Sequence, residues 1–316
     1  MTKIIKKAIE IHFNVRILHF KILAMFSKHL KWILLFVLAL IWGSSFILIK
    51  RGLDGGNGLT PYQLGSLRII FATIFLLIIG FKSIATIPSV KWKYIALTAF
   101  VGTFMPVYLF SIAETEIASS IAAVLNSLTP LGALVLGTLA FGLQAQKRQV
   151  YGVIIGLVGS VLLIANGAAN NPDQNYWYAL LVVFAAFCYS LNVNLIKKYL
   201  SDVKPVAITA GNFIVLLVPA LIILFSTDFT TAVVKSEVQN AMLYIVILGT
   251  VGTGVANIIY FKLIHMSSPV FASSVTYMIP VVAFFWGILD NELFTPIQYV
   301  GAAIIFVGIY LSAKKQ

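Results

Sequence analysis

The sequence predicts an all-α integral membrane protein of ten transmembrane helices, arranged as two inverted five-helix repeats. The first observation is composition: 60% of the 316 residues are hydrophobic, 10% are charged and the mean hydropathy is +0.99, which is not the composition of a soluble domain. The second is an internal repeat, in which Pro130 and Pro280 lie at an offset of 150 residues. The third is that each copy holds five hydrophobic segments, and an odd number inverts the second copy in a bilayer.

The repeat involves residues of several kinds, and small changes in offset fall where loops are expected. The matched pairs are Leu48-Ile49-Lys50 with Leu195-Ile196-Lys197, Arg68 with Asn212, Tyr94 with Tyr244, Gly102-Thr103 with Gly252-Thr253, and Gly159 with Gly308. Such self-similarity predicts two copies of one unit. We expect a cytoplasmic N-terminal extension over 1–31, a first five-span repeat over 32–168, and a second over 169–316 with a short C-terminal tail. The extension is basic and loosely amphipathic, which leaves an interfacial helix and a segment without a role as alternatives.

Ten apolar, largely uncharged segments follow one another along the chain. A hydrocarbon core of about 30 Å needs about 20 apolar residues per helix, and Lys, Arg, Gly or Pro bound the segments. In order, they are 32–50, 63–81, 94–113, 118–141, 149–166, 176–196, 206–226, 242–262, 269–289 and 297–313. The loops between them are short, which leaves little room for a domain outside the membrane.

Basic residues are distributed unevenly between the two ends of these segments. Most of the 22 Lys and Arg residues fall on the side of the N-terminus, whereas the other side holds only Lys50, Arg51 and Lys235. Positively charged loops stay in the cytoplasm, so both termini are predicted to be cytoplasmic. The net charge of +12 then faces anionic lipid headgroups, and no segment is free to form a basic nucleic-acid-binding surface.

Polar side chains within the segments are the candidate functional residues, because lipid cannot satisfy them. They recur at helical spacing, as in the stripe Thr250, Thr253, Asn257 and Tyr260. The simpler alternative is hydrogen bonding between packed helices, at about 0.6 to 2 kcal/mol per pair. The residues predicted to line a substrate cavity are Trp42, Arg68, Tyr108, Asn126, Pro130, Tyr189, Asn192, Thr253, Asn257, Tyr260, Ser273, Tyr277 and Pro280.

Charge and proline placement add detail to this cavity. Arg68 lies within a segment and either extends its guanidinium toward the outer surface or faces the cavity, where it would attract a carboxylate or phosphate. Pro130 and Pro280 free backbone carbonyls near mid-membrane, which favours a water-filled cavity at that depth. Glu114 and Asp290 are predicted at the outer mouth. No Asp or Glu falls at mid-depth, so a carboxylate proton relay has no obvious carrier.

Several short motifs together resemble one transporter family. They are Trp42-Gly43-Ser44-Ser45-Phe46 with Lys50, Arg68 with Ala72, Pro130, and the run from Ser273 to Pro280 with Trp286-Gly287 and Glu292. Over about residues 32–313 the chain resembles the EamA-type transporters of the drug/metabolite transporter superfamily. The resemblance implies a bacterial inner-membrane carrier with five-plus-five inverted repeats around a central cavity, often an exporter. The Gly-Glu that usually precedes the last span of each repeat reads Asn291-Glu292 in one copy and Gly142-Leu143 in the other.

These observations predict a secondary transporter that moves a small polar or amphiphilic metabolite or drug by alternating access. A passive channel or lipid scramblase using the same polar pathway is the alternative. An enzyme is not predicted, because His12, His19 and His29 lie near the N-terminus and His265 stands alone, without the partners that acid/base or metal chemistry needs. We expect a small-molecule substrate, no metal or cofactor, no nucleic acid, and a monomer or homodimer in the lipid bilayer.

Overall fold

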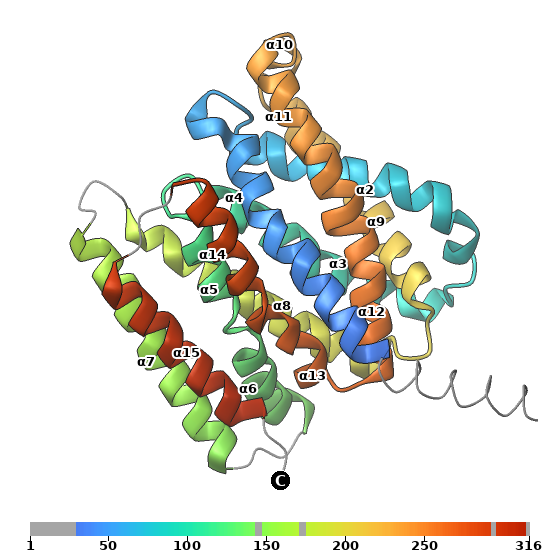
Figure 1. The fold of residues 1–316 in the computed structure, drawn as a ribbon. Coiled ribbons are helices and arrows are strands. Elements are labelled where there is room, and N and C mark those ends of the chain that lie inside the picture. Colours follow the sequence, from blue (N-terminus) through green and yellow to red (C-terminus); the bar gives the residue numbers. More distant parts are fainter. Residues whose placement is uncertain (1–29, 143–146, 171–174, 292–294, 314–316) are drawn as a thin grey trace, which may run out of the picture.

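A computed structural model describes residues 30–142, 147–170, 175–291 and 295–313, and over these ranges the chain is helical and contains no strand (Figure 1). Residues 1–29 of the predicted extension and Glu292 lie outside them. Each of the ten predicted segments lies in a helix or a series of consecutive helices. Eight of these are long and apolar enough to cross a membrane: Leu30–Leu53, α2 (Pro61–Ile84), Ser89–Ala113, Ser119–Phe141, Tyr176–Tyr199, α9 (Pro205–Phe225), Ser236–Met266 and Phe271–Leu289.

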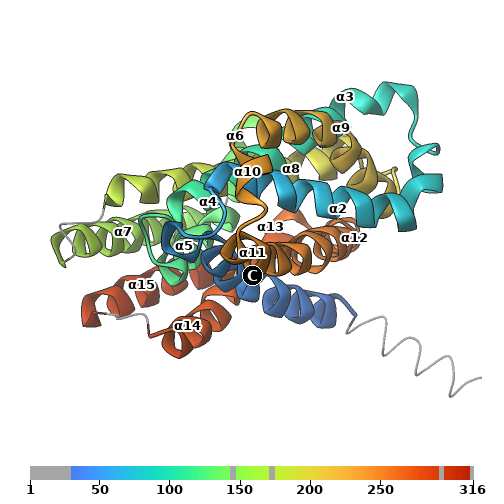
Figure 2. The ribbon, with the colours of Figure 1, turned by 90° about the horizontal axis from the view of Figure 1, so that it is seen from above.

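The remaining two segments form α7 (Lys147–Asn170) and α15 (Pro296–Ala313), which pack side by side at one edge of the bundle (Figures 1 and 2). Over the described residues, the apolar parts identified in these two helices are Val150–Gly159 and Pro296–Gly308. The structure is therefore that of a helical membrane protein, and the crossing of the bilayer by all ten segments stays a prediction.

Glycines bring α7 and α15 into backbone contact. A Cβ at Gly308 would lie 2.5 Å from both the carbonyl oxygen of Gly152 and the amide nitrogen of Gly156, and one at Gly159 would lie 2.8 Å from the amide nitrogen of Ile305. Real side chains do not approach backbone this closely, so these positions accept only glycine. Close approach over small residues is how helices pair in membranes.

Replacing Gly308 by leucine is expected to force α7 and α15 apart. Overpacking costs about 1–3 kcal/mol where neighbours can adjust, and here the neighbours are backbone atoms that cannot rotate away. We expect a lower unfolding temperature and less monodisperse protein in detergent. The control is Ala303→Leu on the exposed side of the same helix, and equal stability of the two variants would contradict the packing role.

Two of the spans are interrupted at repeat-related positions. Ser119–Phe141 consists of α5 (Ser119–Asn126) and α6 (Thr129–Phe141), and Phe271–Leu289 consists of the end of α13 (Pro269–Ser273), the 3₁₀ turn η6 (Ser274–Tyr277) and α14 (Ile279–Leu289). Pro130 and Pro280 each lie in the first turn of the helix after the break. Proline suits this position because its missing N–H has no helical partner there.

Two other spans contain π-helical turns, again at repeat-related positions. Ser89–Ala113 consists of η2 (Ser89–Lys91), α3 (Trp92–Ala99), the π turn η3 (Phe100–Phe104) and α4 (Met105–Ala113). Ser236–Met266 consists of α11 (Ser236–Ile247), the π turn η5 (Leu248–Val255) and α12 (Ala256–Met266). The matched pairs Gly102-Thr103 and Gly252-Thr253 lie in these turns. Such turns are rare and are found frequently at functional sites.

The remaining helices are two short helices that connect spans and the two that form the span Tyr176–Tyr199. They are η1 (Asp54–Gly56), η4 (Tyr176–Tyr178), α8 (Ala179–Tyr199) and α10 (Phe229–Ala232). The start of α2 is fixed by a capping box, in which Thr60 and Gln63 exchange hydrogen bonds between side chain and backbone. This satisfies backbone N–H groups that a helix leaves open at its N-terminus.

Polar contacts distinguish two ends of the bundle. The ammonium group of Lys50 lies 2.5 Å from the Asp290 carboxylate, which Arg51 also contacts, just after α14. Its repeat counterpart Lys197 donates to the carbonyl oxygen of Ser267 (2.7 Å), just before α13. Because α13 and α14 belong to one span, Lys50 and Lys197 lie at opposite ends of the bundle, as inverted copies would place them. We refer to these as the Asp290 end and the Lys197 end.

The Lys197 end is closed by contacts between spans. Lys197 also donates to the carbonyl oxygen of Ile264 (3.1 Å). Lys91 donates to the carboxylate of Asp202 (2.8 Å) and to the carbonyl oxygen of Tyr199 (2.9 Å), whose ring stacks on Tyr94 with centroids 4.3 Å apart. The hydrogen bond from Lys91 lowers the pKa of the exposed Asp202 carboxyl, so this contact holds at neutral pH.

Candidate functional site

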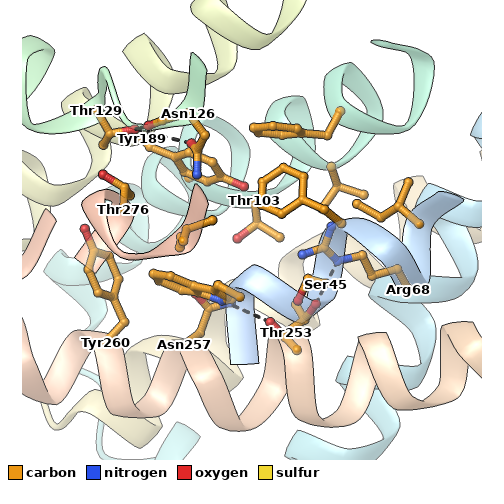
Figure 3. Close-up of a pocket in the computed structure, with 18 of the residues that line it drawn as sticks. Ser45, Arg68, Thr103, Asn126, Thr129, Tyr189, Thr253, Asn257, Tyr260 and Thr276 are labelled. Carbon is orange, nitrogen blue, oxygen red and sulfur yellow. Dashed lines mark hydrogen bonds between the residues drawn. The ribbon is translucent and has the colours of Figure 1, made fainter. Parts of the chain in front are cut away.

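A cavity that is partly open to solvent lies in the middle of the bundle. Seven spans contribute to its wall, and Figure 3 shows their side chains converging on it. Eight of the thirteen residues predicted from the sequence line it: Trp42, Arg68, Asn126, Tyr189, Asn192, Thr253, Asn257 and Tyr260. Their proximity makes a binding site possible, and their contact with a substrate stays a prediction.

Arg68 brings a positive charge into the wall of this cavity. Its residue is only 8% exposed, and its Nε donates to the hydroxyl of Thr253 (2.7 Å), which itself donates to the carbonyl oxygen of Leu248 (2.9 Å) within the π turn. Of the two alternatives, the guanidinium therefore faces the cavity instead of extending to the surface. Among the described residues that line the cavity, Arg68 alone is charged.

Trp42 connects the first helix to the second π turn. Its indole N–H donates to the carbonyl oxygen of Gly252 (3.0 Å), and its ring meets that of Tyr260 edge-on with centroids 4.9 Å apart. On the opposite wall, the rings of Phe110 and Tyr189 stack with centroids 6.1 Å apart. The cavity thus combines aromatic surfaces with a few polar groups, as small-molecule sites generally do.

Asn192 presents an unsatisfied polar atom in this wall. The residue is 4% exposed, and its side-chain oxygen has no hydrogen-bond partner in the described structure. Its amide packs against Gly102, where any Cβ would overlap it. Leaving a buried acceptor unpaired costs about 1–3 kcal/mol. The position is therefore suited to a donor group on a bound molecule or to a water.

The carbonyl groups near the two proline breaks are partly satisfied by hydroxyls. Thr129 donates to the carbonyl oxygen of Asn126 (2.7 Å), and Thr276 donates to that of Ser273 (2.9 Å). Ser190 donates to the carbonyl oxygen of Thr129 (2.7 Å). The carbonyl that Pro130 frees, that of Asn126, thus already has a protein donor beside the cavity.

Five predicted residues lie outside the cavity. The hydroxyl of Tyr108 is 2.9 Å from that of Ser66, and its ring packs on α2. Pro130 and Pro280 begin helices behind the wall, and Ser273 is fully buried. Tyr277 packs against the apolar cluster of α5, α8 and α14. For all but Ser273, a neighbour in sequence lines the cavity instead: Val107, Thr129, Thr276 and Ile279.

Most lining residues form repeat-related pairs, although the sequence analysis selected only some of them. The pairs are Trp42 with Tyr189, Ser45 with Asn192, Gly102 with Gly252, Thr103 with Thr253, Val107 with Asn257, Phe110 with Tyr260, Asn126 with Thr276, and Thr129 with Ile279. A cavity walled by matched residues lies where the two copies meet. Applying the repeat offset to each selected residue would have found Ser45, Thr103, Val107, Phe110 and Thr276.

A bundle of apolar helices around an internal cavity with a polar and aromatic wall is the architecture of a multi-pass membrane transporter. The chain belongs to the EamA-like transporter family, whose sequence profile matches residues 30–165 and again residues 176–314. The family description and the names of its relatives indicate transporters and not enzymes.

Individual relatives carry transporter names as well. The chain is 28% identical over 285 residues to the uncharacterized inner membrane transporter YedA of Escherichia coli K12, covering 88% of each protein. It is 22% identical to a probable amino-acid metabolite efflux pump of the same strain, covering 89% of this chain and 93% of that protein. It is 24% identical to the S-adenosylmethionine/S-adenosylhomocysteine transporter of Chlamydia muridarum, covering 88% and 90%.

A solved crystal structure has the same fold. It superimposes with a TM-score of 0.64 at 16% sequence identity, covering 89% of this chain and 96% of that one. At this identity the likeness concerns the fold alone.

Proposed function

We propose that the protein is an inner-membrane carrier that exports a small amino-acid-like metabolite by alternating access of its two repeats. The observation that carries the proposal is Arg68, a cation in a cavity wall that is otherwise uncharged over the described residues. A buried guanidinium attracts carboxylate and phosphate groups through charge-assisted hydrogen bonds. The substrate therefore carries an anionic group, and its remainder meets a neutral wall.

The aromatic part of the wall suits the rest of an amino-acid-like molecule. Arg68 and Tyr260 lie at opposite sides of the cavity in Figure 3, and Trp42 packs on Tyr260. An ammonium group or an apolar side chain is accommodated by aromatic faces, while Asn192 and Asn257 offer hydrogen bonds. The printed names of two relatives, an amino-acid metabolite efflux pump and an S-adenosylmethionine transporter, support a substrate of this class and, in the first case, the direction.

The distribution of basic residues supports a cytoplasmic location of both termini. The two repeats that alternate in this proposal are 32–168 and 169–316. The Asp290 end then faces the periplasm and the Lys197 end the cytoplasm. The contacts that close the Lys197 end favour a carrier over a channel or scramblase, because a channel needs a path that is open along its whole length.

Counterflow in proteoliposomes tests this function. Vesicles that contain purified protein and an unlabelled amino acid are diluted into buffer with the same amino acid in radiolabelled form. A carrier then produces a transient, saturable accumulation of radiolabel inside the vesicles. Methionine and leucine are compared with their decarboxylated amines, which keep the side chain and the ammonium group. We expect counterflow and competition from the amino acids and little competition from the amines. A voltage-driven current without counterflow would identify a channel instead.

A further inference from the structure

Three residues line the cavity while their repeat counterparts do not. Phe46, Ile49 and Arg68 belong to the wall. Their counterparts Val193, Ile196 and Asn212 are at most 1% exposed, and the first two belong to an apolar cluster between α3, α8, α9 and α12. Phe46 and Ile49 lead from the cavity toward Lys50. The cavity therefore extends toward the Asp290 end, and matched residues close it toward the Lys197 end.

Arg68 and Asn212 occupy equivalent places in their helices. Each follows by seven residues the proline that opens its helix, Pro61 in α2 and Pro205 in α9. Arg68 reaches Thr253 in the second π turn. The counterpart of Thr253 is Thr103 in the first π turn, but Asn212 does not reach it in this structure.

Asn212 instead contacts the helix before that turn. Its amide nitrogen, oriented to satisfy its neighbours, donates to the carbonyl oxygen of Ile95 (3.0 Å) and to the hydroxyl of Thr98 (3.1 Å) on α3. On the third span α9 packs more on α3 than on η3, whereas on the eighth span α2 packs more on η5 than on α11. The amide of Asn212 thus ends on α3, before the first π turn, whereas the longer side chain of Arg68 reaches into the second π turn.

Two inverted copies with different conformations imply a second state in which the conformations are exchanged. We propose that Asn212 is a substrate-facing residue of that second state. When the Lys197 end opens, Asn212 leaves its contacts on α3 and faces the cavity, and Arg68 becomes buried as Asn212 is in this structure. The inference rests on the alternating access proposed above.

The charge of the cavity wall differs between the two states, because Arg68 faces the cavity in one and Asn212 in the other. The wall carries a cation when it faces the Asp290 end and a neutral amide when it faces the Lys197 end. A charge-assisted hydrogen bond is roughly twice as strong as a neutral one. An anionic substrate group is therefore held more tightly from the Asp290 end, and asparagine makes the second state less selective for that group.

Cysteine labelling tests which residue faces the cavity in each state. Asn212→Cys, Ile49→Cys and Thr209→Cys are made in a Cys188→Ser background, each with and without Lys197→Met, which removes contacts that close the Lys197 end. We expect Lys197→Met to speed N-ethylmaleimide labelling of Asn212→Cys roughly fivefold, as a shifted two-state population would, and to slow that of Ile49→Cys.

Thr209 is the matched control. It is as buried as Asn212 and lies one turn earlier on α9, but its counterpart Gly65 packs against Tyr108 and not against the cavity. Its labelling is expected to stay slow in both backgrounds. Should Asn212→Cys fold poorly, Val193→Cys and Ile196→Cys report the same opening.

The outcomes separate the two proposals. Slower labelling of Ile49→Cys without faster labelling at 193, 196 or 212 would overturn the role of Asn212 and leave alternating access standing. No change at any of these positions would contradict alternating access itself.

The charge is tested at Thr276, which lies in the wall. Thr276→Cys should react faster with an anionic than with a cationic methanethiosulfonate reagent, and Lys197→Met should reduce that ratio. A ratio that does not respond to Lys197→Met would overturn the state-dependent charge.

Discussion

Replacing Arg68 by alanine is expected to reduce uptake of a carboxylate-bearing substrate about 10- to 100-fold, with normal amounts of folded protein. The estimate follows from the 1.5–3 kcal/mol that hydrogen bonds to charged groups contribute. Arg68→Lys should retain part of the activity, because an ammonium keeps the charge but loses the planar donor pair. Counterflow rate, expression level and unfolding temperature are measured on the same preparations.

Lys204→Ala is the control for charge, because Lys204 is exposed before α9. It should leave transport unchanged. The decisive comparison is substrate preference: Arg68→Ala should lose the distinction between an amino acid and its decarboxylated amine. If Arg68→Lys and Arg68→Ala lose folded protein equally, the contact between Arg68 and Thr253 is structural and the cavity assignment of this residue is wrong.

Asn257→Leu is expected to abolish transport or change its substrate while the protein stays folded. Leucine is close to asparagine in size, so the substitution removes two donors and an acceptor from the wall with little change in shape. A substrate group that paired with the amide is then buried without a partner, which costs about 1–3 kcal/mol. The measurement is counterflow together with a thermal shift induced by methionine or leucine.

The matched control for Asn257 is Thr250→Val on the same span. Thr250 belongs to the same polar stripe in the sequence, but it lies outside the cavity, and its hydroxyl donates to the carbonyl oxygen of Val246. It should transport normally. Normal transport by Asn257→Leu would remove this residue from the substrate pathway.

The helices were predictable because hydrophobic composition and the repeat act over whole segments. The individual residues that line the cavity were harder to predict. Polarity was the criterion for selecting them, and it favoured Tyr108 over Val107 because only tyrosine has a hydroxyl. Neighbouring residues on a helix point about 100° apart, and the structure directs Tyr108 to Ser66 on α2. The repeat offset of 150 residues pairs Asn257 with Val107, which does line the cavity.

Local backbone geometry accounts for the rest of the difference. Proline within an apolar segment predicted freed carbonyls beside a cavity. Pro130 and Pro280 instead begin new helices, and Asn126 and Thr276 in the turns before them line the cavity. The π turns leave no mark in composition. The repeated Gly-Thr pairs predicted only the repeat, and in the structure Gly102 leaves room for the side chain of Asn192.

The paired wall has a consequence for how this architecture can acquire new cargo. Because one ancestral position now occurs twice around a shared axis, a substitution alters half of a matched pair and leaves the other half intact. Six of the eight wall pairs have already diverged in this way, among them Val107 with Asn257, Phe110 with Tyr260, and Asn126 with Thr276. Duplication thus lets substrate recognition change one residue of a pair at a time, because the residue in the other copy still contributes its original contact.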